Sequence, residues 1–232
     1  MYWIAVGDVH ESTGMLKSIP GIGRAEGLIL TGDLTNRGRE DKAQSVLDQA
    51  SEANPSLLAQ MGNMDYPEVG ELLSRRGENI HRQARVLASG LVLMGVGFST
   101  PTPFGTPSEI PEETLELWLK ETHQLALDLA AKDCAARACP EGGVRLVAVI
   151  HTPPLNTSLD RTSGGVHVGS PAVRAFIEQA QPEVVLCGHI HESVGEERLG
   201  ASHVLNPGLL ASGGYVRLGF IDGQLRASLE RI

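Results

Sequence analysis

The sequence predicts an α/β fold in a single domain that spans residues 1–232. Short apolar segments rich in Val, Ile and Leu alternate with segments of helical periodicity, which is the pattern of strands connected by helices. Five of the apolar segments end at an Asp, Asn or His, and ligands of open α/β sheets bind beyond the carboxyl ends of the strands. No Gly/Ser linker, charge block or internal repeat indicates a second domain.

The stretch 182–191, PEVVLCGHIH, carries the strongest functional pattern. Residues 184–187 form a short apolar run between a proline and a glycine, which predicts a buried strand. His189 and His191 follow in an extended segment at i and i+2, so both imidazoles leave the same side and can converge on metal. For this stretch alone, two histidines on a surface loop remain the alternative.

Three apolar segments near the amino terminus also end at donors. Each is followed by a glycine and then by a residue with a side-chain oxygen. The segments and their donors are residues 2–6 with Asp8 and His10, residues 27–31 with Asp33, and residues 56–61 with Asn63. The same arrangement therefore repeats at successive strand ends.

Helices are expected after the second and third of these strands. The first helix has apolar residues at helical spacing, namely Ala43, Val46, Leu47 and Ala50. For the second, we expect Asp65 as the N-cap, with Pro67 in the first turn and Glu68 completing an Asp-x-x-Glu capping box. Gly77 is expected to end it.

The middle of the chain predicts regular elements on both sides of a long loop. The regular elements are a hairpin of residues 85–88 and 91–96, a helix over residues 112–138, and a strand over residues 146–150. The strand ends at His151. Residues 99–111 are rich in Pro, Thr and Gly, and we expect this loop to border the site, with Phe104 in the pocket wall.

A polar, Gly-rich loop over residues 156–169 carries two weaker site candidates, Arg161 and His167. Arginine suits phosphate oxygens and histidine can donate a proton, whereas hydrogen bonding within the loop is the alternative role. Ser170 is expected to cap the helix that follows. The remaining strands are residues 202–205 and a terminal hairpin of residues 215–221 and 225–229, turned by Asp222 and Gly223.

Composition and charge argue against several partners. The formal net charge of −9 disfavours non-specific binding to nucleic acid or anionic membranes. Cys134, Cys139 and Cys187 suggest no paired framework, and Cys187 lies in an apolar strand, which suits a reducing cytoplasm. No signal peptide or membrane span is visible, so we expect a cytoplasmic protein, and a homo-oligomer is compatible with this composition.

The donors are too numerous for one divalent cation in an open site. They are Asp8, His10, Asp33, Asn63, His151, His189 and His191. Two ions that share a bridging carboxylate fit better. Ions about 3.5–4 Å apart suit in-line attack on phosphorus, with a bridging hydroxide as nucleophile and the ions holding the non-bridging oxygens.

The donors lie in motifs that follow one another along the chain. The motifs are GDVH (7–10), GDLT (32–35), GN (62–63), His151, GHIH (188–191) and NPG (206–208). This series resembles the calcineurin-like metallophosphoesterase superfamily over nearly the whole chain. The stretches GNMDYPEV, PTPFGTP, HTPP and HVGSPAVRAFI resemble its Icc-related branch of predicted phosphoesterases.

This resemblance implies a four-layer αββα sandwich of two mixed sheets flanked by helices, and a dinuclear metal-dependent phosphoesterase. It assigns one ion to Asp8, His10, Asp33 and His191, and the other to Asp33, Asn63, His151 and His189. Asp33 would be the bridge. Mn²⁺ is the expected metal, with Fe, Zn, Ni or Co as alternatives, and the expected substrates are small phosphoesters or nucleotides.

Met64 departs from the superfamily's pattern. The usual GNH[DE] motif has a histidine at this position, which contacts substrate and is thought to protonate the leaving group. A thioether has no proton to give. We therefore expect a phosphodiesterase that favours good leaving groups, rather than a phosphomonoesterase.

Two other functions remain open at this stage. Some members of the superfamily act as binding scaffolds with an altered site, so a metal-binding interaction scaffold with little or no catalysis is the main alternative. A scaffold would keep seven donors only if the metals served its structure. A dinuclear hydrolase of amides has no motif of its own in this chain.

Overall fold

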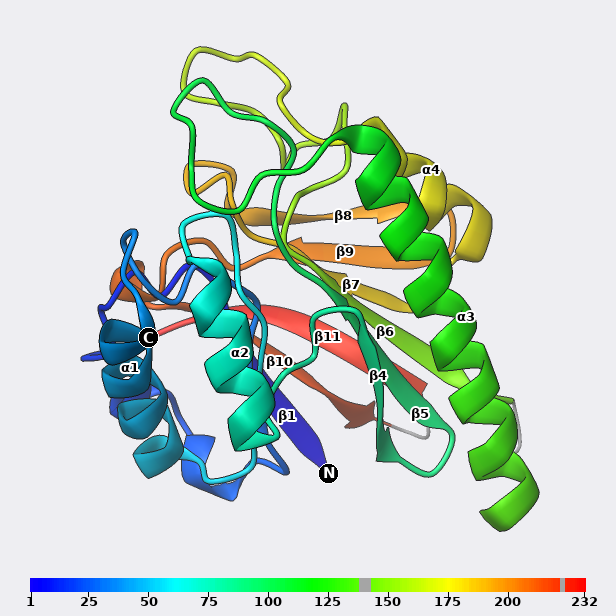
Figure 1. The fold of residues 1–232 in the computed structure, drawn as a ribbon. Helices are drawn as coiled ribbons and strands as arrows, with labels where there is room; N and C mark the ends of the chain where they lie inside the picture. The colour runs from blue at the N-terminus through cyan, green and yellow to red at the C-terminus, as the bar shows by residue number, and fades with distance from the viewer. Residues whose placement is uncertain (138–142, 222–223) are drawn as a thin grey trace.

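The chain folds into four layers, with two β-sheets between two layers of helices (Figure 1). The computed structural model describes residues 1–137, 143–221 and 224–232. The expected αββα sandwich is confirmed. Three expectations concern residues outside the described ones, namely the helix end at Ala138, the pairing of Cys139, and the turn at Asp222 and Gly223.

The first sheet has the strand order β11-β10-β1-β2-β3. Its strands are β1 (Tyr2–Val6), β2 (Leu28–Leu30), β3 (Leu57–Ala59), β10 (Gly214–Ile221) and β11 (Gln224–Arg231). β1, β2 and β3 are parallel, whereas β10 runs antiparallel to β1. The carboxyl ends of the three parallel strands therefore meet at one edge.

The second sheet has the order β4-β5-β6-β7-β9-β8. Its strands are β4 (Gln83–Ala88), β5 (Leu91–Val96), β6 (Arg145–Ile150), β7 (Val184–Leu186), β8 (Gly195–Leu199) and β9 (Ser202–Asn206). β5, β6, β7 and β9 are parallel. β8 was not expected, because it is a short edge strand of alternating burial that carries charged residues in place of an apolar run.

The helices cover the outer faces of the two sheets, as Figure 1 shows. They are α1 (Glu40–Ala53) and α2 (Pro67–Arg76) on the first sheet, and α3 (Glu112–Arg137) and α4 (Pro171–Ala180) on the second. Apolar residues fill three clusters, one under each helical layer and one between the sheets. The cluster between the sheets holds Trp3 and Leu93 and fixes both sheets against each other.

The helix caps agree with the sequence expectation except at one position. The Ser170 side chain accepts a hydrogen bond from the backbone of Val173 and caps α4 as expected. Gly77 ends α2 in the left-handed conformation. The expectation for Asp65 is wrong, because Tyr66 is the N-cap residue of α2 and makes no side-chain cap.

The cysteines differ from the expectation. Cys134 on α3 is disulfide-bonded, so the prediction that the chain holds no pair is wrong for this residue. Cys187 is free and fully buried next to β7, as expected for a small apolar side chain. Among the described residues, no helix combines the length and apolarity needed to cross a bilayer.

His81 is a partly buried histidine between the second sheet and α3. Its ring stacks on Phe98 with centroids 5.0 Å apart, and its Nδ1 accepts a hydrogen bond from the Gly97 backbone at 3.0 Å. Burial, aided by the charge of Arg82, lowers the pKa of His81 to about 4. The folded protein therefore keeps this ring neutral at pH values where the unfolded chain is protonated.

With His81→Gln, the free energy of unfolding is expected to fall less steeply as the pH is lowered from 6.5 to about 4. Between pH 6.5 and about 4 the unfolded chain binds a proton at His81 and the folded chain does not, so acidification destabilises the wild type. The effect should reach about 2–4 kcal/mol in the free energy of unfolding. Urea unfolding of both chelated proteins at several pH values measures the effect. If the free energy of unfolding had the same pH dependence in wild type and variant, His81 would take up a proton in the folded protein as readily as in the unfolded chain.

Candidate metal centre

The structure brings all seven expected donors to one edge of the two sheets. Asp8 and His10 follow β1, Asp33 follows β2, and Asn63 follows β3. From the second sheet, His151 follows β6, while His189 and His191 follow β7. These residues are far apart in the sequence and meet because parallel strands end together.

Four of these donors have positive φ angles, a backbone conformation that residues other than glycine rarely adopt. The φ angles are 41° at Asp8, 45° at His10, 47° at Asp33 and 69° at His189. Positive φ is unfavourable for residues with a Cβ, and such strain gathers at functional sites. The chain thus turns sharply after β1, β2 and β7, and the donor there points toward the cluster instead of continuing the strand.

Glycines next to the donors leave the space in which they converge. A Cβ on Gly62 would overlap the carboxylate of Asp33, and a Cβ on Gly32 would overlap the ring of His151. Gly32 also has a φ of 132°, which only glycine adopts readily. Glycine at positions 32 and 62 is thus a steric requirement of the cluster.

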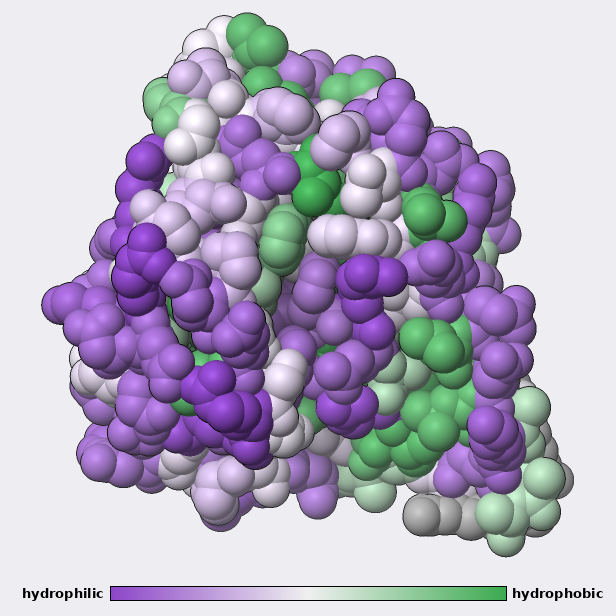
Figure 2. All heavy atoms as spheres, in the orientation of Figure 1, coloured by the Kyte–Doolittle hydropathy of each residue, from purple (hydrophilic) through white to green (hydrophobic). Residues whose placement is uncertain are grey.

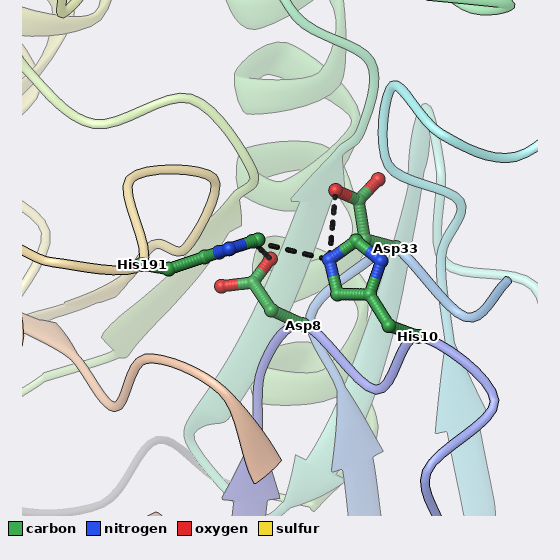
Figure 3. A group of neighbouring side chains, drawn as sticks. All are labelled: Asp8, His10, Asp33 and His191. Atoms are coloured by element: carbon green, nitrogen blue, oxygen red, sulfur yellow. Dashed lines mark hydrogen bonds and ion pairs between the residues drawn. The ribbon is translucent and has the colours of Figure 1, made fainter. Parts of the chain in front are cut away.

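The first group of donors comprises Asp8, His10, Asp33 and His191. Figure 3 shows the rings of His10 and His191 directed toward each other beside the two carboxylates. Their Nε2 atoms are 3.1 Å apart. Nε2 of His10 lies 3.6 Å from Asp33 Oδ2, and Nε2 of His191 lies 3.9 Å from Asp8 Oδ1.

The second group comprises Asp33, His151 and His189, and Asn63 lies among them. Asn63 Oδ1 is 3.0 Å from His151 Nε2 and 2.7 Å from His189 Nδ1. His151 Nε2 is also 3.5 Å from Asp33 Oδ1. Asp33 therefore turns one carboxylate oxygen to each group, which is the geometry of a bridging ligand.

The electrostatics of the metal-free cluster are those of a buried ion pair. Burial opposes the charge on His151, but the carboxylates of Asp33 and Asp8 outweigh it and raise the pKa of His151 to about 9. Burial also acts to raise the pKa of Asp33, but His151 outweighs it and the pKa falls to about 2. A cation bound here must displace the proton of His151, so its affinity should increase with pH.

The donor set fits divalent cations. Asp8 Oδ2 is buried and has no hydrogen-bond partner among the described residues, although an uncompensated buried carboxylate oxygen is costly. Each group combines imidazole nitrogens with carboxylate or amide oxygens, ligands that suit Mn, Fe, Co, Ni or Zn. The residues present could therefore hold two cations, with Asp33 common to both.

Asn36 orients one of the donor histidines. Its Oδ1 is 2.8 Å from His10 Nδ1, and its Nδ2 donates to the His10 carbonyl at 3.0 Å. A proton on Nδ1 of His10 satisfies the first contact and leaves Nε2 free as a ligand atom. No motif or periodicity in the sequence singles out Asn36, although it lies three residues after Asp33.

Thr106 and Glu109 orient Asn63. Asn63 Nδ2 donates to Thr106 Oγ1 at 3.0 Å, and Thr106 Oγ1 donates to Glu109 Oε1 at 2.6 Å. Burial opposes the charge of Glu109, but hydrogen bonds from Thr102 and Thr106 hold its pKa below the usual range. A charged Glu109 accepts from the hydroxyl, so the hydroxyl accepts from the amide, and Asn63 must present Oδ1 to the cluster.

Asp65 organises the cluster in place of capping α2. Its carboxylate is buried and accepts from the backbones of Leu34 and Thr35 at 3.0 and 2.8 Å, and from Gly62 at 2.9 Å. It also accepts from the Thr35 hydroxyl. Asp65 thus joins the loop that carries Asp33 to the loop that carries Asn63, a long-range role that the local capping pattern concealed.

The remaining candidates differ in whether they line the cavity above the cluster. Met64 lines a cavity above it, and so does Phe104, as expected from the sequence. His167 pairs with buried Asp160 at 2.7 Å, and the Arg161 carbonyl accepts from Ser193. Neither Arg161 nor His167 is among the residues that line the cavity, so their catalytic role stays a prediction.

Comparisons with known proteins indicate the family of this chain. A family model described as metallophosphoesterase, calcineurin superfamily, matches residues 136–227. An uncharacterized protein of Methanocaldococcus jannaschii is 31% identical over 189 residues, which cover 79% of this chain and 77% of that protein.

Solved structures share the fold. A Thermus thermophilus protein is 21% identical with a TM-score of 0.67, and the match covers 98% of this chain and 97% of that one. A dimetal phosphatase of Danio rerio is 9% identical with a TM-score of 0.62, over 100% and 96% of the two chains.

Thr106→Val is expected to weaken Mn²⁺ binding to the chelated protein by about 10- to 100-fold at one of the two positions. Without the hydroxyl, the Asn63 amide loses the partner that fixes its orientation. Isothermal titration calorimetry measures the change. Thr102→Val is the matched control, because Thr102 donates to the same Glu109 oxygen without contacting Asn63. An equal loss in both variants would mean that the loop as a whole is responsible.

Proposed function

Because the chain belongs to the calcineurin superfamily of metallophosphoesterases, we propose that it is a metal-dependent phosphoester hydrolase with two divalent cations. The observation that carries this proposal is the position of Asp33, which turns one oxygen to each group of donors. A shared buried carboxylate between two sets of imidazoles suits a pair of cations better than a single one.

The proposed ligand sets follow the two groups. Asp8, His10, Asp33 and His191 would hold one cation, and Asp33, Asn63, His151 and His189 would hold the other. The cations would supply an activated water and a positive field for the phosphate oxygens. The chain's own residues fix the donors, since Asn36 orients His10, Thr106 orients Asn63, and the Met64 backbone donates to Asp33 Oδ1 at 2.8 Å.

We further propose a preference for phosphodiesters with good leaving groups. The Met64 side chain lines the cavity and has no proton to donate, so the leaving group must depart with little assistance. The acidic protein also repels a singly charged diester less than a doubly charged monoester. Mn²⁺ is the first metal to test, and small phosphoesters or nucleotides are the substrate classes.

A cytoplasmic location stays a prediction, because the disulfide at Cys134 removes part of the cysteine argument for a reducing compartment. A homo-oligomer also stays a prediction.

A metal-binding scaffold without catalysis is the alternative function. The test is hydrolysis of bis(p-nitrophenyl) phosphate by chelated protein before and after Mn²⁺ is added. Activity that depends on the metal supports the proposed function. No turnover with any of the candidate metals, while the metals still bind, would favour the scaffold.

Asp33→Asn is expected to abolish activity more completely than any other single change among the donors. The neutral amide cannot compensate two cations, so metal content should fall from two ions toward none and kcat/KM by about 10³-fold or more. Metal analysis after dialysis measures the content. Asp128→Asn, an exposed position on α3, is the control. Two tightly held ions in Asp33→Asn would show that Asp33 is not the bridge.

Met64→His is expected to speed the hydrolysis of substrates with basic leaving groups, with little change for aryl diesters. Asp65 already accepts four hydrogen bonds and cannot orient the new imidazole, so the gain should lie near the lower end of the roughly 10²–10⁴-fold range for general acids. The slope of log kcat/KM against leaving-group pKa measures it.

Met64→Leu is the matched control for this prediction and should keep the steep wild-type slope. A slope that is already flat in the wild type, with chemistry limiting the rate, would show that another residue supplies the proton. His167 would then be the first residue to substitute.

A further inference from the structure

A cavity of about 920 Å³ opens directly over the candidate metal centre. The donors His10, Asp33, Asn63, His189 and His191 form part of its wall, so the cavity and the metal centre are one continuous site. Pockets of this size accommodate drug-sized ligands. A phosphate group alone would occupy a small part of it, which leaves room for a second, bulky part of the substrate.

Two loops form the walls above the donors, residues 100–106 and residues 162–168, and Figure 1 shows both at the top of the molecule. Most of the large side chains that line the cavity outside the donors are apolar, namely Met64, Pro101, Pro103, Phe104, Val168, Ile190 and Leu209. The smaller lining residues of the two loops are chiefly threonine, serine and glycine. These walls offer carbon surface and uncharged hydroxyls.

The walls carry little charge that could bind a polyanion. Among the described lining residues, Arg37 is the only arginine or lysine. Its Nη2 is already used for the carbonyls of Phe104 and Gly105, at 2.9 and 3.2 Å. Glu192 also lines the cavity and accepts from Ser163. A second phosphate or a carboxylate on the substrate would find only this one, already engaged guanidinium among the described lining residues.

Apolar side chains at the rim are exposed. Phe104 is 77% exposed although it lines the cavity, and Val168 is 39% exposed. Figure 2 shows apolar surface on the loop tips at the top of the molecule, in contrast to the largely polar left side. An apolar group that enters between the loops would cover this surface and gain hydrophobic free energy.

We propose that the substrate is a phosphoester that carries a bulky, uncharged, apolar group, and that this group lies between residues 100–106 and residues 162–168. The proposal rests on the proposed function, because the donor cluster binds the phosphate part. Phe104 and Val168 are the residues that determine specificity for the apolar group, one from each loop.

The experiment uses phosphonates, which keep the phosphorus group while the attached group changes. Inhibition constants of methylphosphonate, phenylphosphonate and 2-naphthylphosphonate are measured on the Mn²⁺-loaded protein against bis(p-nitrophenyl) phosphate. The naphthyl compound should bind at least about tenfold more tightly than the methyl compound, since its ring system buries apolar area. A 4-carboxyphenyl compound should bind more weakly than phenylphosphonate.

Phe104→Ser and Val168→Ser should each reduce this tenfold preference by at least about threefold and leave the methylphosphonate constant unchanged. Val166→Ser is the matched control, because Val166 lies in the same loop, is 61% exposed and does not line the cavity. It should behave as the wild type.

The outcomes separate the two proposals. Hydrolysis of the diester with equal constants for all phosphonates would overturn the apolar-group proposal and leave the proposed function intact. If the naphthyl compound bound more tightly than the methyl compound to the same extent in wild type, Phe104→Ser and Val168→Ser, the apolar-group proposal would also be overturned. Absence of both hydrolysis and phosphonate binding would overturn the proposed function itself.

Discussion

The buried carboxylate of Asp33 is the group on which the rest of the site depends. It lies between histidines from both sheets, with Oδ2 toward His10 and Oδ1 toward His151. A buried charge is tolerated only when opposite charge and hydrogen bonds compensate it. In the metal-free protein a proton on His151 provides this compensation, and it holds the pKa of Asp33 at about 2. Two cations would provide it more completely, so the same geometry serves both states.

Three loops hold this carboxylate in place through hydrogen bonds that cross long stretches of sequence. The Asp65 carboxylate accepts from the backbone of Leu34, which follows Asp33, and from that of Gly62, which precedes Asn63. The Ser108 backbone donates to the Asn63 carbonyl at 3.0 Å. The Ser108 hydroxyl donates to the Asp65 carbonyl. The loop that walls the cavity is therefore attached to the loop that presents a donor. The same short segments therefore shape the cavity wall and hold a donor in position.

The donors could be predicted from sequence because each follows an apolar strand, and parallel strands carry their ends to one edge. The residues that orient the donors could not be predicted in this way. Thr106 lies in a loop without periodicity, and its contact with Asn63 depends on how that loop folds back. Asp65 fitted a local capping pattern, but its carboxylate satisfies backbone groups about 30 residues away. β8 was missed because an exposed, charged edge strand lacks the apolar run that marks a buried one.

Methionine can replace the histidine that is usual at position 64 without disturbing the donors, because only the backbone of this residue bonds to the donor cluster. Its backbone N–H donates to Asp33 Oδ1 at 2.8 Å, and its carbonyl accepts from the Arg37 backbone at 3.1 Å. Any residue other than proline can make these bonds. The side chain faces the cavity, where the neighbouring walls are also largely apolar. The residue type at this position therefore changes the wall of the cavity and leaves the hydrogen bonds that hold the donor cluster intact.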